Sequence, residues 1–225
     1  MAQRILIIVP CYNEGEVLKT TVQELVDLHY EVVVVDDGSL VSPWEEMLRG
    51  MPIHFLRHTI NLGQGAALQT GMDYAKSLHA DAVVHFDADG QHSPEDIPTM
   101  VEMLQKVDIV LGSRFLCKEY LAKVPFMKRQ LLRCARIVNR LFTGLKLTDV
   151  HNGLRALGPA ALAAIDLTEN RMAHATEIVS QIKQNRLSWC EVPSNIRYTT
   201  YSRQKGQRWY NSVNILIDLV LNKIF

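Results

Sequence analysis

Short apolar runs alternate with segments of helical periodicity through the first half of the chain. The runs are rich in β-branched residues and predict strands at residues 4–9, 31–35, 53–57, 82–86 and 107–111. Between them, apolar residues at helical spacing predict helices at residues 16–29 and 65–78. Uninterrupted apolar strands that alternate with helices are typical of a parallel sheet covered on both faces. We therefore expect an α/β fold whose ligands bind beyond the carboxyl ends of the strands.

The second half carries two amphipathic segments. Residues 127–142 predict a helix on which four arginines share a sector of about 60° opposite the apolar face. These arginines are Arg129, Arg133, Arg136 and Arg140. Such one-sided charge favours contact with an anion or an anionic membrane surface, and a solvated helix face is the alternative. Residues 209–225 predict a last amphipathic helix, which we expect on a membrane surface, against the core or against a second copy.

Composition indicates a globular chain. Of its 225 residues, 48% are hydrophobic and 21% are charged, which excludes global disorder and permits a sizeable core. The four cysteines are far apart and form no C-x-x-C pair, so neither a disulfide scaffold nor a cysteine-rich zinc site is expected. The apolar stretch at residues 5–9 is too short for a secretory signal, and no run of 18 uncharged apolar residues is present. These features predict a cytoplasmic location without a membrane span.

The net charge of zero hides an asymmetry between the two halves. Residues 1–112 hold 6 Lys and Arg against 17 Asp and Glu, a balance of −11. Residues 113–225 hold 18 basic against 7 acidic residues, a balance of +11. This division suggests a cation in the first half and an anionic partner for the second. The alternative is that the two halves neutralise each other across a contact.

Two carboxylates separated by one residue follow the fourth predicted strand, in the segment DADGQH at residues 87–92. Paired carboxylates at a strand end can hold Mg²⁺ or Mn²⁺ together with substrate phosphates, and Gln91 or His92 can add a further ligand. The alternative is an aspartate-rich turn before a helix, because the segment SPED at 93–96 is a typical helix start.

Three further strand ends carry polar or glycine-rich segments: PCYNE at 10–14, DDGS at 36–39 and NLGQGAA at 61–67. A tyrosine ring can stack on a nucleobase, and carboxylates can accept hydrogen bonds from a base or a ribose. A plain turn is the alternative for DDGS. The glycine-rich segment has neither G-x-G-x-x-G nor a G-K-[ST] ending, so we exclude a Rossmann dinucleotide site and a P-loop.

These segments, with GSRF at 112–115 and TDVHNGLRAL at 148–157, stand in the order found in family 2 glycosyltransferases. The chain resembles that family over residues 4–208, and within it the polyprenyl-phosphate sugar transferases, such as the dolichol-phosphate mannose synthases. The resemblance implies a GT-A fold, a Rossmann-like and mostly parallel sheet flanked by helices. It also implies one catalytic domain over residues 1–208, followed by the amphipathic helix at 209–225.

The resemblance assigns roles to individual residues. The donor nucleotide would be bound by Pro10, Tyr12, Glu14, Asp36, Asp37, Ala88, Arg203 and Arg208. The metal, Mg²⁺ or Mn²⁺, would be held by Asp87, Asp89 and Gln91. The catalytic residues would be Asp89, Arg114, Asp149 and Arg155.

The chain departs from the family pattern at two places. Asp149 is followed by VHNGLR, where the branch usually has a Thr/Ser-Ser-Gly-Phe-Arg turn, and the HN pair at 151–152 is unusual. The late segment reads GQR at 206–208, where Gly-x-Ser-Lys is usual, and Arg208 can supply the missing cation one position earlier. The first departure leaves the acceptor open.

The resemblance implies an inverting, metal-dependent transfer of a sugar from a nucleoside diphosphate sugar to a polyprenyl phosphate. A phosphate acceptor is mostly ionised at pH 7 and needs no strong base. A soluble enzyme that used a saccharide or protein hydroxyl would need a base, for which Asp149 and His151 are the candidates. We expect a peripheral protein on the cytoplasmic face of the membrane, with a second copy or a small membrane protein as candidate partners.

Two other function classes are disfavoured. A nucleotidyltransferase usually carries a glycine-rich basic signature near its first strand, and PCYNE has neither trait. A nucleic-acid binder would fit the basic second half, but that half lacks interleaved aromatics and any recognisable binding motif. We therefore expect no nucleic-acid partner.

Overall fold

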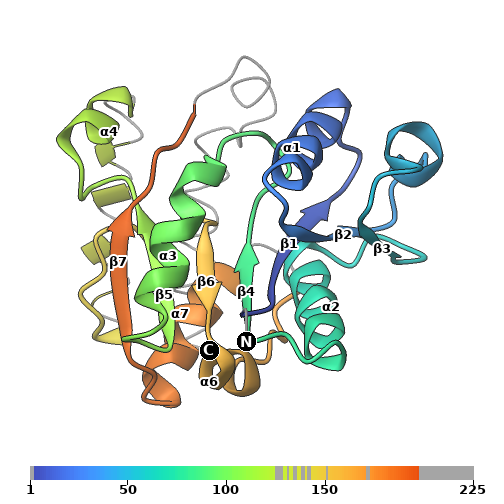
Figure 1. Ribbon diagram of the computed structural model, residues 1–225. Coiled ribbons are helices and arrows are strands. Elements are labelled where there is room, and N and C mark those ends of the chain that lie inside the picture. Colours follow the sequence, from blue (N-terminus) through green and yellow to red (C-terminus); the bar gives the residue numbers. More distant parts are fainter. Residues whose placement is uncertain are drawn as a thin grey trace.

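The computed structural model describes residues 3–124, 129–130, 132–133, 136–137, 140, 143–150, 152–170 and 173–197. They form a seven-stranded sheet in the order β3-β2-β1-β4-β6-β5-β7 (Figure 1). The strands are β1 (Ile5–Cys11), β2 (Glu31–Asp36), β3 (His54–Arg57), β4 (Ala82–His85), β5 (Ile109–Ser113), β6 (Arg155–Leu157) and β7 (Trp189–Pro193). Neighbouring strands are parallel except at β6, which is antiparallel to both β4 and β5. The predicted mostly parallel sheet is confirmed.

Helices cover both faces of the sheet. They are α1 (Glu16–Asp27), α2 (Gln64–Ser77), α3 (Ile97–Met103), α4 (Lys118–Lys123), α6 (Pro159–Ala164) and α7 (His174–Gln184), with the short turns η1 (Trp44–Leu48) and η2 (Pro94–Asp96). In β1, Leu6 and Ile8 share a core with α2, α6 and α7, whereas Ile7 and Val9 share one with α1 and α3. Successive side chains of a strand point to opposite faces, so the uninterrupted apolar runs are buried on both sides.

The short strand β6 lies at the centre of the sheet, between β4 and β5. Arg155 pairs with His85 on one side and with Leu111 on the other. Because β6 runs antiparallel to both neighbours, its amino end lies at their carboxyl ends. The turn that contains Asp149 therefore reaches the same edge of the sheet as the acidic segment after β4.

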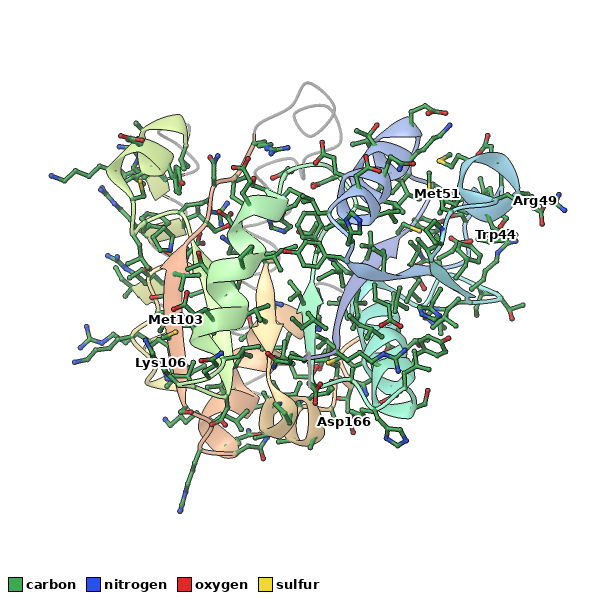
Figure 2. The ribbon with its side chains drawn as sticks, viewed as in Figure 1. Trp44, Arg49, Met51, Met103, Lys106 and Asp166 are labelled. Atoms are coloured by element: carbon green, nitrogen blue, oxygen red, sulfur yellow. The ribbon has the colours of Figure 1, made fainter. Side chains whose placement is uncertain are left out.

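The segment η1 packs beside β3 at one end of the sheet. The ring of Trp44 lies 5.5 Å from that of Phe55 between centroids, and Figure 2 shows Trp44 and Met51 on this side of the molecule. Met103 and Lys106 lie toward the opposite edge, near β7 (Figure 2). Trp44 and Phe55 both pack against the core that lies under α1 and α3, so η1 extends this core toward β3.

Several sequence predictions concern the chain after β5. Arg203, Arg208, His151 and residues 209–225 lie outside the described residues. Of the arginine stripe, Arg133 and Arg140 are exposed. Arg129 is half-buried, and its Nη2 donates to the Leu121 carbonyl at 2.9 Å. Nη2 of Arg129 thus binds the carboxyl end of α4, and contact of the stripe with an anion or an anionic membrane surface stays a prediction.

None of the helices in the described part of the chain combines the length and the apolar composition needed to cross a bilayer.

A test of the packing between α2 and β1 is Gly71→Ala. A methyl group added at Gly71 would lie 2.4 Å from Ile8 Cγ2. Alanine favours a helix over glycine by about 1 kcal/mol, but overpacking costs about 1–3 kcal/mol. We expect a free energy of unfolding lower by about 1 kcal/mol in urea titrations. Asp73→Ala, on the exposed side of the same helix, should change it by less than about 0.5 kcal/mol. A Gly71→Ala protein as stable as the wild type would contradict this packing.

Candidate active site

The candidate site lies where the carboxyl ends of the parallel strands meet the amino end of β6. Asp87 follows β4, and its Oδ1 accepts a hydrogen bond from Gln64 Nε2 at 3.0 Å. Its Oδ2 lies 2.9 Å from His92 Nε2. Gly153 approaches from the segment before β6, where an added Cβ would lie 2.4 Å from Asp87 Oδ2. Asp87 is thus held from three segments that are far apart in the sequence.

Asp89 belongs to the same loop and is bound by Gln91. The backbone N of Gln91 donates to Oδ1 at 3.0 Å, and its Nε2 donates to Oδ2 at 2.7 Å. Burial and the charge of Asp87 together raise the pKa of Asp89. Burial also pushes the pKa of Asp87 upward, but the charge and hydrogen bond of His92 outweigh it and leave that pKa lowered. Two carboxylates that disfavour each other's charge form a site where a cation is stabilised.

The residues present fit a divalent metal ion. Asp87 and Asp89 offer hard oxygen atoms, and the amide nitrogen of Gln91 is bound to Asp89, so its carbonyl oxygen is the atom left for a cation. In the part of the chain that the structure describes, no three His, Cys, Asp or Glu side chains form a ligand group. Mg²⁺ commonly takes one or two carboxylates and completes its shell with substrate phosphates and water. A metal here would therefore depend on a phosphate-bearing ligand.

Two buried polar side chains lie behind Asp87. His85 is 1% exposed, and neither ring nitrogen has a hydrogen-bond partner among the described residues. Burial lowers the pKa of His85 to about 3, and the charges of Arg155 and His174 act in the same direction. Burial also lowers the pKa of Arg155, to about 10, although Asp87 and Asp149 oppose this. Arg155 thus remains a cation that balances both carboxylates from within the sheet.

Arg114 and Asp149 form a buried ion pair on the far side of β6. Arg114 Nε donates to Asp149 Oδ2 at 2.6 Å, and Nη2 donates to Oδ1 at 2.7 Å. The backbone N of Arg114 adds a third bond to Oδ2 at 3.0 Å. This two-pronged geometry is the strong form of an arginine–carboxylate pair. Both oxygens of Asp149 are therefore bound to Arg114.

The predicted nucleotide residues lie at the ends of β1 and β2. Tyr12 is 41% exposed, Glu14 is half-buried, and Pro10 is buried. Asp36 is fully buried: its Oδ1 accepts from the backbone N of Ser39 at 3.0 Å. Its Oδ2 lies 3.1 Å from the Nε of Arg57, in an ion pair.

Asp37 and Ala88 have buried positions as well. Asp37 accepts the backbone N–H groups of Leu62 at 2.9 Å and Gly63 at 2.7 Å, and its Oδ1 lies 2.8 Å from His58 Nδ1. Asp37 therefore anchors the glycine-rich segment that precedes α2. Among the residues assigned to the nucleotide that the structure describes, Tyr12 is exposed and Glu14 is half-buried, whereas the others are buried.

The chain leaves β7 beside the acidic loop. The backbone N of Arg197 donates to the Gln91 carbonyl at 2.7 Å, and its Nη2 donates to Ser93 Oγ at 3.1 Å. The segment that leads to Arg203 and Arg208 thus starts next to Gln91.

Sequence reasoning did not find every residue that shapes this site. Gln64, Gly153 and Glu191 were missed, because each acts through a contact with a distant segment. Glu191 accepts hydrogen bonds from the turn that contains Asp149. Gln64 lies within the glycine-rich segment and Gly153 within the segment at 148–157, and neither motif by itself indicates a contact with Asp87.

Residues 6–165 match the family model described as glycosyl transferase family 2. The chain belongs to this family. The UDP-N-acetylglucosamine–dolichyl-phosphate N-acetylglucosaminyltransferase of Methanococcus voltae is 29% identical over 100% of this chain and 98% of its own length. The undecaprenyl-phosphate mannosyltransferase of Micrococcus luteus is 34% identical over 73% of this chain and 70% of its own length. The protein is thus a glycosyltransferase.

A solved structure shares the fold of this glycosyltransferase. The 4-diphosphocytidyl-2C-methyl-D-erythritolsynthase of Anaerococcus prevotii has a TM-score of 0.53 at 12% identity, over 96% of this chain and 98% of that chain. At such identity the likeness concerns architecture alone, and a fold does not determine an activity. The expected GT-A class, with its seven-stranded sheet and flanking helices, is confirmed.

The burial of His85 predicts a pH effect on stability. The folded protein keeps His85 neutral down to about pH 3, whereas the unfolded chain protonates it below its ordinary pKa of 6.5. Stability is therefore lost as the pH falls below 6.5, by about 2 kcal/mol at a pH about 1.5 units lower. Glutamine stays neutral, so His85→Gln should lose about 2 kcal/mol less between pH 7.5 and pH 5 in urea titrations. Equal losses in the two proteins would show that His85 does not titrate in this way.

Proposed function

We propose that this glycosyltransferase moves a sugar from a nucleoside diphosphate sugar to the phosphate of a polyprenyl phosphate, with inversion. The carrying observation is the ion pair between Arg114 and Asp149, across β6 from the acidic loop. It holds a guanidinium, the group best suited to a phosphate, at the carboxyl end of β5. Support also comes from the M. voltae and M. luteus relatives, whose names specify lipid phosphates.

Of the two candidate bases for a hydroxyl acceptor, Asp149 is the one that the structure describes, and its contacts favour a phosphate acceptor. A hydroxyl must give up a proton to a base, and the two candidates were Asp149 and His151. Both oxygens of Asp149 accept hydrogen bonds from Arg114, and His151 lies outside the described residues. A phosphate monoester has a second pKa near 6, so its oxygen is already a nucleophile at pH 7.

The reaction is then a direct displacement at the anomeric carbon. A bond forms between an acceptor phosphate oxygen and that carbon, while the bond to the donor diphosphate breaks. The acceptor oxygen arrives on the face opposite the leaving group, so the anomeric configuration inverts. No proton transfer is required for this step.

The residues of the chain stabilise charge around this displacement. A divalent ion held by Asp87, Asp89 and Gln91 would supply positive charge beside the departing diphosphate. Arg114 would bind the acceptor phosphate, and Arg155 keeps its own charge close to Asp87 and Asp149. We place Arg203 and Arg208 at the donor phosphates, since the segment leading to them starts beside Gln91.

The donor nucleotide is placed at the ends of β1 and β2. Tyr12 offers an exposed ring on which a base can stack, and Glu14 offers a carboxylate to a base or a ribose. Asp36, Asp37 and Ala88 are buried, so they would support the nucleotide-binding residues from inside the protein.

We further propose contact with an anionic membrane surface. Arg133, Arg140 and Ile137 are exposed on the segment after α4, so that basic and apolar side chains occur together there. Each basic residue near such a surface contributes about 1 kcal/mol. The protein would then work at the cytoplasmic face, with residues 209–225 as a second contact for the membrane, a second copy or a small membrane protein.

The acceptor is tested with a radiolabelled nucleotide sugar offered with polyprenyl phosphate or with free saccharides. We expect label in the lipid fraction only, and faster transfer when the lipid sits in anionic vesicles than in neutral ones. The initial rate in each vesicle type is the measurement. Label on a saccharide and none on the lipid would establish the hydroxyl alternative instead.

The metal assignment is tested with Asp89→Ala and with EDTA. Loss of a group that neutralises transition-state charge typically lowers turnover by about 100-fold or more, and we expect this from each treatment. Mg²⁺ or Mn²⁺ should restore the EDTA-treated wild type but not the variant. Asp27→Ala, on the exposed side of α1, is the matched control and should keep full turnover. Full turnover of Asp89→Ala, or of the wild type in EDTA, would contradict the assignment.

A further inference from the structure

Glu191 of β7 is a carboxylate that binds the turn at residues 148–149. Its Oε1 accepts hydrogen bonds from the backbone N–H of Thr148 at 2.8 Å and of Asp149 at 3.1 Å. Its Oε2 also lies 2.9 Å from the N of Thr148. Glu191 is half-buried and stands directly opposite Leu111 in the pairing of β5 with β7. One side chain of the sheet thus holds the backbone of the turn that presents Asp149.

The same turn is tied to the end of β5. Ser113 Oγ lies 2.6 Å from Thr148 Oγ1, and the backbone N of Phe115 donates to Ser113 Oγ at 3.1 Å. Asp149 then receives three hydrogen bonds from Arg114. A continuous series of contacts therefore leads from Glu191 through the turn to the guanidinium.

The charges of this cluster explain why Glu191 needs its amide partners. Burial and, to a smaller extent, the charge of the neighbouring Asp149 raise the pKa of Glu191, whereas its hydrogen bonds to Thr148 and Asp149 lower it. Arg114 neutralises Asp149, and the charge of Arg155 also acts on Asp149. Two acids and two arginines thus balance within a largely buried region, and a carboxylate without its amides would be disfavoured there.

We propose that Glu191 is a positioning residue for the lipid phosphate. By fixing the turn at 148–149, it orients Asp149, and Asp149 in turn holds the Nε edge of the Arg114 guanidinium. The guanidinium that the proposed function assigns to the acceptor phosphate is thereby kept in one orientation. This inference rests on the proposed function for the identity of the ligand. The contacts that lead from Glu191 to Arg114 do not depend on it.

Two substitutions at Glu191 should give graded effects. Alanine removes both acceptor oxygens, so the amides of Thr148 and Asp149 lose their partner. Glutamine keeps one acceptor oxygen. Its NH₂ group takes the place of the other oxygen of Glu191, where it faces a backbone N–H and cannot accept from it. Glu191→Gln should therefore retain part of the function that Glu191→Ala loses.

The control is Asp108→Ala, at the opposite end of β5 and β7. Asp108 Oδ2 accepts hydrogen bonds from the backbone N of Ser188 at 2.7 Å and from Ser188 Oγ at 2.6 Å. It joins the same two strands by the same kind of bond, but far from the site. A purely structural role for Glu191 would give matching effects in the two alanine variants.

The first measurement is the steady-state rate of sugar transfer with varied polyprenyl phosphate and with varied donor. A small misplacement of a binding group can lower a rate by about 100-fold, so we expect kcat/KM for the acceptor to fall by about 10–100-fold in Glu191→Ala. The KM of the donor should stay within about twofold, because its residues lie at β1, β2 and β4. Asp108→Ala should leave both parameters unchanged.

The second measurement does not depend on any activity. The Nε–H group of Arg114 gives a nitrogen-15 NMR signal, which is identified by its loss in Arg114→Lys. Its hydrogen exchange should be at least about tenfold faster in Glu191→Ala, intermediate in Glu191→Gln and unchanged in Asp108→Ala.

The outcomes separate the two proposals. Exchange at Arg114 that is unaffected by either Glu191 variant, or acceptor effects equal to those of Asp108→Ala, would overturn the positioning role. A wild-type protein that does not use polyprenyl phosphate would overturn the proposed function, while the exchange measurement would still decide whether Glu191 orders Arg114. Should Glu191→Ala fail to fold, Glu191→Gln provides the same comparison.

Discussion

The arrangement of this protein depends on the repulsion between Asp87 and Asp89 at the end of a buried strand. The two carboxylates share a half-buried loop, in which burial and the charge of Asp87 raise the pKa of Asp89. His92 and Gln64 hold Asp87, Gln91 holds Asp89, and Arg155 adds a positive charge near Asp87. A cation at this pair would relieve the repulsion, and the surrounding hydrogen bonds keep the loop in place.

Hydrogen bonds to backbone amides organise the rest of the edge. Asp37 binds the start of the glycine-rich segment, and Glu191 binds the turn before β6. In both cases a carboxylate on one strand end fixes a loop that belongs to another part of the chain. Some acidic residues of this protein therefore lie in the candidate site, and others hold the loops that carry the residues of that site.

The architecture alone does not identify the reaction. A structure named as a cytidyl-group synthase shares the fold at 12% identity, and the family match is what assigns glycosyl transfer. In this protein the antiparallel strand β6 brings Asp149 and Arg155 to the carboxyl edge of the parallel strands, where ligands of open α/β sheets commonly bind.

The amino-acid sequence by itself determined the strands β1 to β5, the acidic segment after β4, and the two helices predicted at residues 16–29 and 65–78, which the structure has at Glu16–Asp27 and Gln64–Ser77. Hydrophobic periodicity and the composition of strand ends are local properties of a sequence. Only the tertiary structure decided that β6 lies antiparallel between β4 and β5, that Asp149 is bound to Arg114, and that Asp37 anchors a loop. These features depend on contacts between segments separated by 20 to 80 residues, about which local pattern carries no information. For the same reason, the two oxygens of a carboxylate can be assigned to a ligand or to the protein only once the donors around it are known.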